Sequence, residues 1–311
     1  MGKTAFVFPG QGAQAVGMGK DAYDASPAAR AIFERADRAL GFELSRIIFE
    51  GPEEALKLTV NTQPALLTVS AALLELIRDR VKPDYVAGHS LGEYSALVAS
   101  GVLAFEDAVR AVRRRGEFME EAVPAGKGAM AAVLGADREA LAKLCEAISA
   151  EKGLVVLANV NCPGQIVVSG TAEGVRAVAE RGREAGAKRV IPLEVSGPFH
   201  SPLMEPAAER LGEVLDALEM RDAEVPVIAN VTAEPVTSAA EIRRLLKEQV
   251  TAPVLWEDTV RRLKALGVDT FVEIGSGSVL TGLIRKTAGS VAIHTVNSLA
   301  ALDAALAALA P

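Results

Sequence analysis

Residues 85–97 constrain the fold of this chain more than any other stretch. Residues 85–87 form a short apolar run that is typical of a buried strand, and a helix-favouring run to Ser100 follows Gly88-His89-Ser90-Leu91-Gly92. The sequence therefore predicts a strand, a sharp turn and a helix, with Ser90 at the apex. The glycines let strand and helix approach closely around a strained serine. A G-x-S-x-G nucleophile elbow requires this context, although the five-residue pattern alone also fits an ordinary turn.

Length and composition narrow the classes of protein further. A chain of 311 residues can hold one large domain, or one domain with an insertion. Its net charge of −7 argues against general nucleic-acid binding, and its two cysteines have no metal or redox spacing. The N-terminal apolar run is too short for a signal peptide, and no stretch suits a transmembrane helix. We therefore expect a soluble cytoplasmic protein with no nucleic-acid or membrane partner.

The N-terminal part predicts a strand at residues 4–8 and helices at residues 29–40, 64–80 and 105–121. Thr62 is the expected N-cap of the second helix, with Pro64 in its first turn. The third helix carries Arg113-Arg114-Arg115, which span most of a helical turn. At least one of these arginines is therefore expected to face inward and to need an anionic partner.

The loop that follows the first strand, residues 9–14, has two possible functions. A phosphate cradle would need G-x-G-x-x-G or a P-loop lysine, and the sequence has neither. The alternative is a backbone turn that brings an amide to an active site. A plain structural turn fits the residues equally well.

Residues 125–196 are predicted to form a small inserted domain. Glycine- and proline-rich joints bound it, at residues 124–128 and at Ser196-Gly197-Pro198. The order of strands and helices is βαββαβ, which is the ferredoxin-like order. The elements are expected at residues 129–134, 138–150, 154–160, 165–169, 172–184 and 189–193.

The larger domain, residues 1–124 and 197–311, continues with alternating strands and helices. Strands are expected at residues 225–229, 269–274 and 291–295, and helices between and after them. Such alternation predicts an α/β fold whose mostly parallel sheet is covered on both faces.

A nucleophilic serine needs a base, and the chain has three histidines. His89 lies in the elbow with its side chain directed away from the serine, and His294 lies inside a strand. His200 follows a Gly-Pro turn at the second domain joint and is the best candidate. No acid between Ser90 and His200, including Asp107 and Asp137, is convincingly placed to orient the imidazole. We therefore expect a Ser-His dyad oriented by a backbone carbonyl or an amide, with an imidazole pKa near its ordinary value of about 6.5.

Six motifs, in this order along nearly the whole chain, resemble the malonyl-CoA:acyl carrier protein transacylase family of fatty-acid and polyketide synthesis. They are Phe8-Pro9-Gly10-Gln11-Gly12, Asn61-Thr62-Gln63-Pro64-Ala65, Gly88-His89-Ser90-Leu91-Gly92-Glu93, Arg115-Gly116, Gly197-Pro198-Phe199-His200-Ser201 and Glu273-Ile274-Gly275. The resemblance implies a large α/β-hydrolase-like domain with a ferredoxin-like insertion, in agreement with the pattern above.

The resemblance also implies roles for single residues. Ser90 matches the nucleophile and His200 the base, while the backbone amides of Gln11 and Leu91 match the oxyanion hole. Arg115 matches the arginine that binds the malonyl carboxylate. Gln249 matches the glutamine whose main-chain carbonyl orients the histidine. Gln63, the bulky Phe199 and, on the small domain, Asn161 are further supporting positions.

The implied reaction is ping-pong transfer of malonyl from malonyl-CoA, through a serine ester, to the phosphopantetheine thiol of acyl carrier protein. The resemblance implies no metal or redox cofactor, because the thioester supplies the energy. Three alternatives remain open: a serine thioesterase or esterase with the same elbow, a discrete acyltransferase of a polyketide pathway, and a non-catalytic scaffold.

Overall fold

The computed structural model describes residues 2–310, which fold into strands and helices in alternation. The strands are β1 (Lys3–Phe8), β2 (Tyr85–Gly88), β3 (Gly128–Leu134), β4 (Val155–Cys162), β5 (Gln165–Thr171), β6 (Arg189–Pro192), β7 (Val227–Ile228), β8 (Pro235–Val236), β9 (Val254–Leu255), β10 (Val268–Ile274) and β11 (Ala292–Val296). The helices are α1 (Lys20–Ala25), α2 (Pro27–Leu40), α3 (Leu44–Glu50), α4 (Glu53–Lys57), α5 (Thr59–Ile77), α6 (Gly92–Ala99), α7 (Phe105–Glu121), α8 (Arg138–Glu151), α9 (Ala172–Arg181), α10 (Glu205–Ala217), α11 (Ala239–Gln249), α12 (Trp256–Ala265), α13 (Val279–Ala288) and α14 (Leu299–Leu309), with short 3₁₀ turns η1 (Gly182–Ala185) and η2 (Pro202–Met204).

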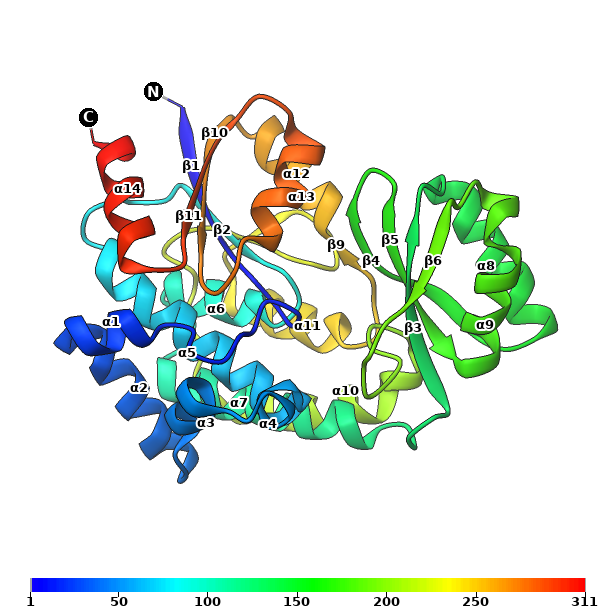
Figure 1. Ribbon diagram of the computed structural model, residues 1–311, viewed down its shortest axis with the longest axis horizontal. Coiled ribbons are helices and arrows are strands. Elements are labelled where there is room, and N and C mark those ends of the chain that lie inside the picture. The colour runs from blue at the N-terminus through cyan, green and yellow to red at the C-terminus, as the bar shows by residue number, and fades with distance from the viewer. Residues whose placement is uncertain (1, 311) are drawn as a thin grey trace.

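The larger sheet has the strand order β11-β10-β1-β2-β7-β8, and every pair except β7–β8 is parallel (Figure 1). Side chains of β1 alternate between two cores. Phe6 and Phe8 pack with α2, α5 and α7, whereas Ala5 and Val7 pack with α12 and α13. Both faces of the sheet are therefore buried, which confirms the predicted α/β class with a mostly parallel sheet.

Parallel pairing brings the ends of β1 and β2 to the same edge of this sheet. Phe8 is in register with Gly88, and the backbone N–H of His89 donates to the Phe8 carbonyl at 3.1 Å. The loop after β1 and the turn after β2 therefore lie side by side at the carboxyl edge. Ligands of open α/β sheets bind at such an edge.

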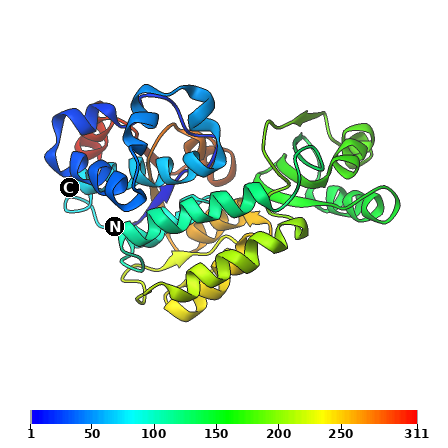
Figure 2. The ribbon, with the colours of Figure 1, turned by 90° about the horizontal axis from the view of Figure 1, so that it is seen from below.

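The smaller sheet has the order β6-β3-β5-β4-β9 and lies beside the larger part of the molecule (Figure 1). Helices α8 and α9 pack on it and enclose a separate apolar core. Figure 2 shows α7 and α10 side by side, leading into and out of this part of the chain. One strand comes from elsewhere: β9, which follows α11, pairs in parallel with β4. The boundary at residue 197 thus leaves out one strand of the smaller sheet.

Helix α5 begins earlier than predicted. Thr62 is not its N-cap, because the helix starts at Thr59, and Pro64 lies inside it. A proline cannot donate to the carbonyl four residues before it, which here is that of Val60. Arg113 of α7 supplies the missing donor, since its Nη1 lies 3.0 Å from the Val60 oxygen. This contact between two helices explains how the proline is tolerated, and no local signal predicts it.

By length and composition, α5 could also cross a membrane, so the prediction that no stretch has this character is wrong. Of its most apolar window, 83% is buried inside the fold. The core helix of a globular protein passes the same test.

The short helices α1, α3 and α4 and the two-residue strands β8 and β9 were also not predicted, because elements of two to seven residues carry too little periodicity.

Glu273 at the end of β10 caps helix α13. Its side chain is fully buried and accepts from the backbone N–H groups of Leu280 and Thr281, at 3.1 and 2.8 Å. Because Gln would turn an NH₂ group toward these donors, we expect Glu273→Gln to lower the free energy of unfolding by about 1–3 kcal/mol. Urea denaturation measures this, with the exposed Asp269→Asn as the control, for which a change within about 0.5 kcal/mol is expected. Equal stability of Glu273→Gln and the wild type would contradict the capping role.

Candidate active site

The turn that carries Ser90 is a strained junction between β2 and α6. Ser90 has a φ of 52°, in the left-handed region that favours glycine. Both flanking glycines are required by close contacts. A Cβ at Gly88 would lie 1.8 Å from the Gly92 oxygen, and a Cβ at Gly92 would lie 2.1 Å from the Phe8 oxygen. The strand, turn and helix predicted from the sequence are therefore present, with Ser90 at the apex.

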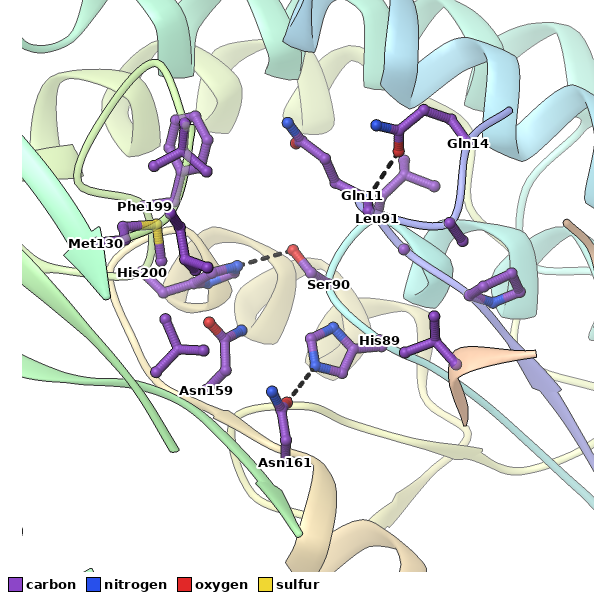
Figure 3. A pocket seen from close by; sticks show the side chains of 18 of the residues that line it. Gln11, Gln14, His89, Ser90, Leu91, Met130, Asn159, Asn161, Phe199 and His200 are labelled. Carbon is purple, nitrogen blue, oxygen red and sulfur yellow. Dashed lines mark hydrogen bonds between the residues drawn. The ribbon is translucent and has the colours of Figure 1, made fainter. Parts of the chain in front are cut away.

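Ser90 and His200 meet across 110 residues of sequence. The Oγ of Ser90 lies 2.7 Å from Nε2 of His200 (Figure 3). The other ring nitrogen, Nδ1, lies 2.8 Å from the backbone carbonyl of Gln249. A carbonyl can only accept, so Nδ1 carries the proton and Nε2 is free to accept from the serine hydroxyl.

Within the described residues 2–310, no carboxylate orients this histidine. Asp107 forms an ion pair with Arg110 on α7, and Asp137 caps α8 through the N–H of Ala140. The Gln249 carbonyl takes the position that an acid has in a triad. The structure thus has the geometry of the dyad that the sequence predicts.

The loop after β1 and the elbow each contribute one backbone N–H group, that of Gln11 and that of Leu91. The loop after β1 approaches the elbow so closely that a Cβ at Gly10 would lie 2.3 Å from the His89 oxygen. Among residues 2–310, the N–H groups of Gln11 and Leu91 donate to no protein acceptor. The side chain of Gln11 is anchored separately, since its Nε2 donates to Thr59 Oγ1 at 3.1 Å. Both amides are therefore available to a ligand, as an oxyanion hole requires.

Arg115 is the arginine of the triplet that faces inward, and only 1% of it is exposed. Its Nη1 donates to Gln63 Oε1 at 2.7 Å, and its Nη2 donates to Gln249 Oε1 at 2.9 Å and to Ser90 Oγ at 3.1 Å. The predicted inward arginine is confirmed. Its need for an anionic partner stays a prediction, because such a partner can be a ligand. Within residues 2–310 its acceptors are neutral, because two glutamines supply carboxamide oxygens. The cation is thus held in place without a carboxylate.

These groups border a cavity of about 520 Å³ between the two sheets. One wall comes from the smaller sheet, with Met130, Asn159, Asn161, Gln165 and Val167, and the opposite wall from the larger part, with Gln11, Ser90, Leu91, Arg115 and His200. Figure 3 shows Phe199 next to His200 at its edge. The cavity residues do not include Gln63 and Gln249, whose side-chain oxygens accept from Arg115. All nine predicted site residues thus lie in or directly next to one cavity.

His89 joins the two walls. Its Nε2 lies 2.7 Å from Asn161 Oδ1 (Figure 3), and its ring packs on Trp256. It therefore has a packing and polar role at the cavity wall, away from the serine hydroxyl. His294 lies half-buried in β11, where the sequence places it.

Sequence reasoning missed Asn230, which holds the elbow. Its Oδ1 accepts from the Ser90 N–H at 2.8 Å, and its Nδ2 donates to the Gly88 carbonyl at 2.7 Å. The strained turn cannot pair these groups with a neighbouring strand, and the carboxamide replaces that partner. The available signal is a polar residue directly after the predicted strand at residues 225–229, at the carboxyl edge of a parallel sheet.

The pKa of His200 differs from the sequence prediction. Burial, and secondly the charge of Arg115, lowers it to about 3 instead of leaving it near 6.5. A reaction that uses neutral His200 as a base should therefore not slow as the pH is lowered through 6.5. Because the unfolded state binds the proton first, stability should fall as the pH drops from about 6.5 toward 3.

An NMR titration of the imidazole resonances checks this prediction, with His200→Gln to assign the signal. We expect the His200 signal to stay in its neutral position from pH 8 to 5. A titration centred near 6.5 would contradict the effect of burial.

Comparisons with known proteins give matches over nearly the whole chain. A model of the acyl transferase domain matches residues 5–311. The chain is 59% identical to the malonyl CoA-acyl carrier protein transacylase of Bacillus subtilis, over 92% of this chain and 90% of that protein. Its fold is similar to the acyl-carrier-protein S-malonyltransferase of Bartonella henselae, with a TM-score of 0.96 and 45% identity over 100% of both chains. It is also similar to a malonyl-transacylase solved in complex with its type II PKS acyl-carrier protein, with a TM-score of 0.95 and 42% identity over 98% of this chain and 99% of that chain.

The matches extend over nearly the whole chain at identities far above the level at which only a fold is shared. They include the elbow, the loop after β1 and both walls of the cavity. The chain therefore belongs to the malonyl-CoA:acyl carrier protein transacylase family of acyl transferases.

Proposed function

We propose that this protein transfers a malonyl group from malonyl-CoA to the phosphopantetheine thiol of acyl carrier protein, through an ester on Ser90. One observation carries the proposal. The Ser90 hydroxyl lies within hydrogen-bond distance of both a neutral imidazole and a buried guanidinium, at 2.7 and 3.1 Å. The first group can take the serine proton, and the second can bind a carboxylate beside the attacked carbonyl.

The first half-reaction acylates the serine. Ser90 Oγ attacks the thioester carbonyl while its proton moves to Nε2 of His200, and the Gln249 carbonyl stabilises the resulting imidazolium. The N–H groups of Gln11 and Leu91 stabilise the oxyanion, each by about 3 kcal/mol. The C–S bond then breaks, and His200 returns its proton to the CoA thiolate.

The second half-reaction reverses these steps with a different thiol. The phosphopantetheine thiol gives its proton to His200 and its sulfur attacks the ester carbonyl. The C–O bond to Ser90 breaks, and Oγ recovers the proton. Atoms and charges balance over both steps, and the thioester energy of CoA is retained in the product.

Arg115 is proposed to bind the free carboxylate of malonyl, supported by Gln63 and Gln249, which hold its two terminal nitrogens. Phe199, next to His200 at the edge of the cavity, restricts the space beside the acyl chain. Asn161 is proposed to bound the cavity from the smaller sheet, where it is held by His89.

We also propose that residues 1–124 and 197–311 form an α/β-hydrolase-like domain and that residues 125–196 form a ferredoxin-like insertion. Three features support the insertion: the βαββαβ element order, the strand order β6-β3-β5-β4, and the separate core under α8 and α9. For the larger domain, the strained serine between β2 and α6 supports the likeness to α/β-hydrolases. A cytoplasmic location is proposed with the same function.

Intact-protein mass spectrometry tests the function. After brief exposure to malonyl-CoA, the wild type should gain one malonyl group, and holo acyl carrier protein should then remove it and appear as malonyl carrier protein. Rapid release of free malonate without carrier protein would favour the thioesterase. Carrier proteins of fatty-acid and polyketide synthesis, compared in the second step, distinguish the two pathways, because the solved complex of a relative contains a type II PKS carrier protein.

A further inference from the structure

The carboxyl of Glu93 has no part in the proposed mechanism, yet it is buried beside the groups that do. Glu93 lies in the first turn of α6, three residues after the nucleophile, and is 3% exposed. Its Oε2 accepts from Nε2 of Gln249 at 2.8 Å. It forms no ion pair with Arg115 within residues 2–310, because the Gln249 carboxamide lies between them.

A carboxamide has an acceptor end and a donor end, and a half-turn exchanges them. In the present orientation the Gln249 oxygen accepts from Arg115, while its Nε2 faces oxygens of Glu93, Ser90 and Asn230 at 2.8, 3.0 and 3.3 Å. After a half-turn the NH₂ group would face the guanidinium, which also only donates. The oxygen would then face three oxygens. The surroundings therefore select one orientation, and Glu93 makes the shortest of the three contacts.

The guanidinium depends on that orientation. Gln63 and Gln249 hold its Nη1 and Nη2, while its Nε is buried without a partner among residues 2–310. Loss of the Gln249 oxygen would leave one of the two holding contacts. Since Nη2 also contacts the Ser90 hydroxyl, a turned guanidinium would place a bound carboxylate wrongly relative to the nucleophile.

We propose that Glu93 is a positioning residue, which fixes the Gln249 carboxamide and, through it, the Arg115 guanidinium. The proposal rests on the proposed function and deepens it, because Glu93 then controls acceptance of malonyl without touching the substrate. Burial raises the pKa of Glu93 to about 7. Both the carboxylate and the carboxylic acid offer an acceptor oxygen, so the orientation holds in either state.

Two substitutions of Glu93 separate the contribution of its hydrogen-bond acceptor from the contribution of its negative charge. Glu93→Met removes the acceptor at similar volume, and Glu93→Gln keeps an acceptor oxygen but removes the charge. Loss of about one hydrogen bond predicts a roughly five- to tenfold lower kcat/KM for acylation by malonyl-CoA in Glu93→Met. Acetyl-CoA, which lacks the carboxylate, should react within about twofold of wild type. Glu93→Gln should restore the malonyl-to-acetyl ratio.

A double substitution tests whether Glu93 acts through Gln249. In a Gln249→Met background, Glu93→Met should change the malonyl-to-acetyl ratio no further. Ser95→Ala is the matched control, because this buried hydroxyl of the same helix is outside the network and should leave the ratio unchanged.

Two outcomes would overturn the proposal. If Glu93→Gln loses selectivity as fully as Glu93→Met, the charge acts directly. If Glu93→Met lowers both thioesters equally, the residue only supports the scaffold. A wild type that takes no malonyl from malonyl-CoA would instead refute the proposed function, so the two failures are distinguishable.

Discussion

Ser90→Ala is expected to gain no malonyl group and to lose transfer to carrier protein by at least about 10⁴-fold. The reason is that, among residues 2–310, only Ser90 Oγ lies within hydrogen-bond distance of Nε2 of His200, the proposed base, at 2.7 Å. Intact mass after exposure to malonyl-CoA measures the adduct, and a coupled assay with holo carrier protein measures the transfer.

Nearby serines give matched controls for this result. Ser95 and Ser201 are both buried, and the Ser201 hydroxyl donates to the Pro198 carbonyl. Ser95→Ala should remain labelled at the wild-type level. A malonyl adduct on Ser90→Ala, or a label that maps to Ser201, would exclude the elbow as the site of acylation.

Arg115→Ala is expected to lose about a hundredfold or more in kcat/KM for malonyl-CoA. The substrate carboxylate would then be buried without its cation, a loss of about 2–5 kcal/mol at about 1.4 kcal/mol per factor of ten. Acetyl-CoA has no carboxylate, so its kcat/KM should be unchanged or higher. Arg115→Lys keeps the positive charge but loses the planar guanidinium, so its kcat/KM for malonyl-CoA should lie between those of the wild type and Arg115→Ala.

The neighbouring arginines show whether the effect belongs to position 115. Arg113 bonds the Val60 carbonyl and Arg114 pairs with Glu117 at the surface. Arg113→Ala should lower stability with little change in the malonyl-to-acetyl ratio, and Arg114→Ala should change neither. Equal losses for both thioesters in Arg115→Ala would make this arginine structural.

Local signals explain what the sequence could predict. The bounds of α7 agree with its predicted range because the helix is long and strongly amphipathic. The glycines at positions 88 and 92 predict a strained turn around Ser90, and the φ of 52° at Ser90 agrees with this prediction. Gln11, Ser90 and Leu91 lie close together because parallel pairing brings the ends of β1 and β2 to one edge.

What the sequence could not predict depends on partners distant along the chain. Asn230 holds the elbow across 140 residues, and Arg113 supplies the donor that Pro64 removes from α5. The pKa of His200 depends on burial by several elements and on a charge 85 positions away, so a value near 6.5 was the only available expectation. These long-range contacts and their effect on the pKa can be identified only in the folded structure.

The pairing of β9 with β4 matters for anyone who exchanges parts between relatives. Val254 and Leu255 form the outer strand of the smaller sheet, five residues after the carbonyl that orients His200. A chimaera cut only at residues 124 and 197 would leave the transplanted sheet beside a foreign edge strand. Poor pairing of β9 with the transplanted β4 would displace the Gln249 carbonyl, and with it His200, because only four residues separate that carbonyl from β9. Residues 249–255 therefore belong with the transplanted segment, although they are more than fifty positions away from it.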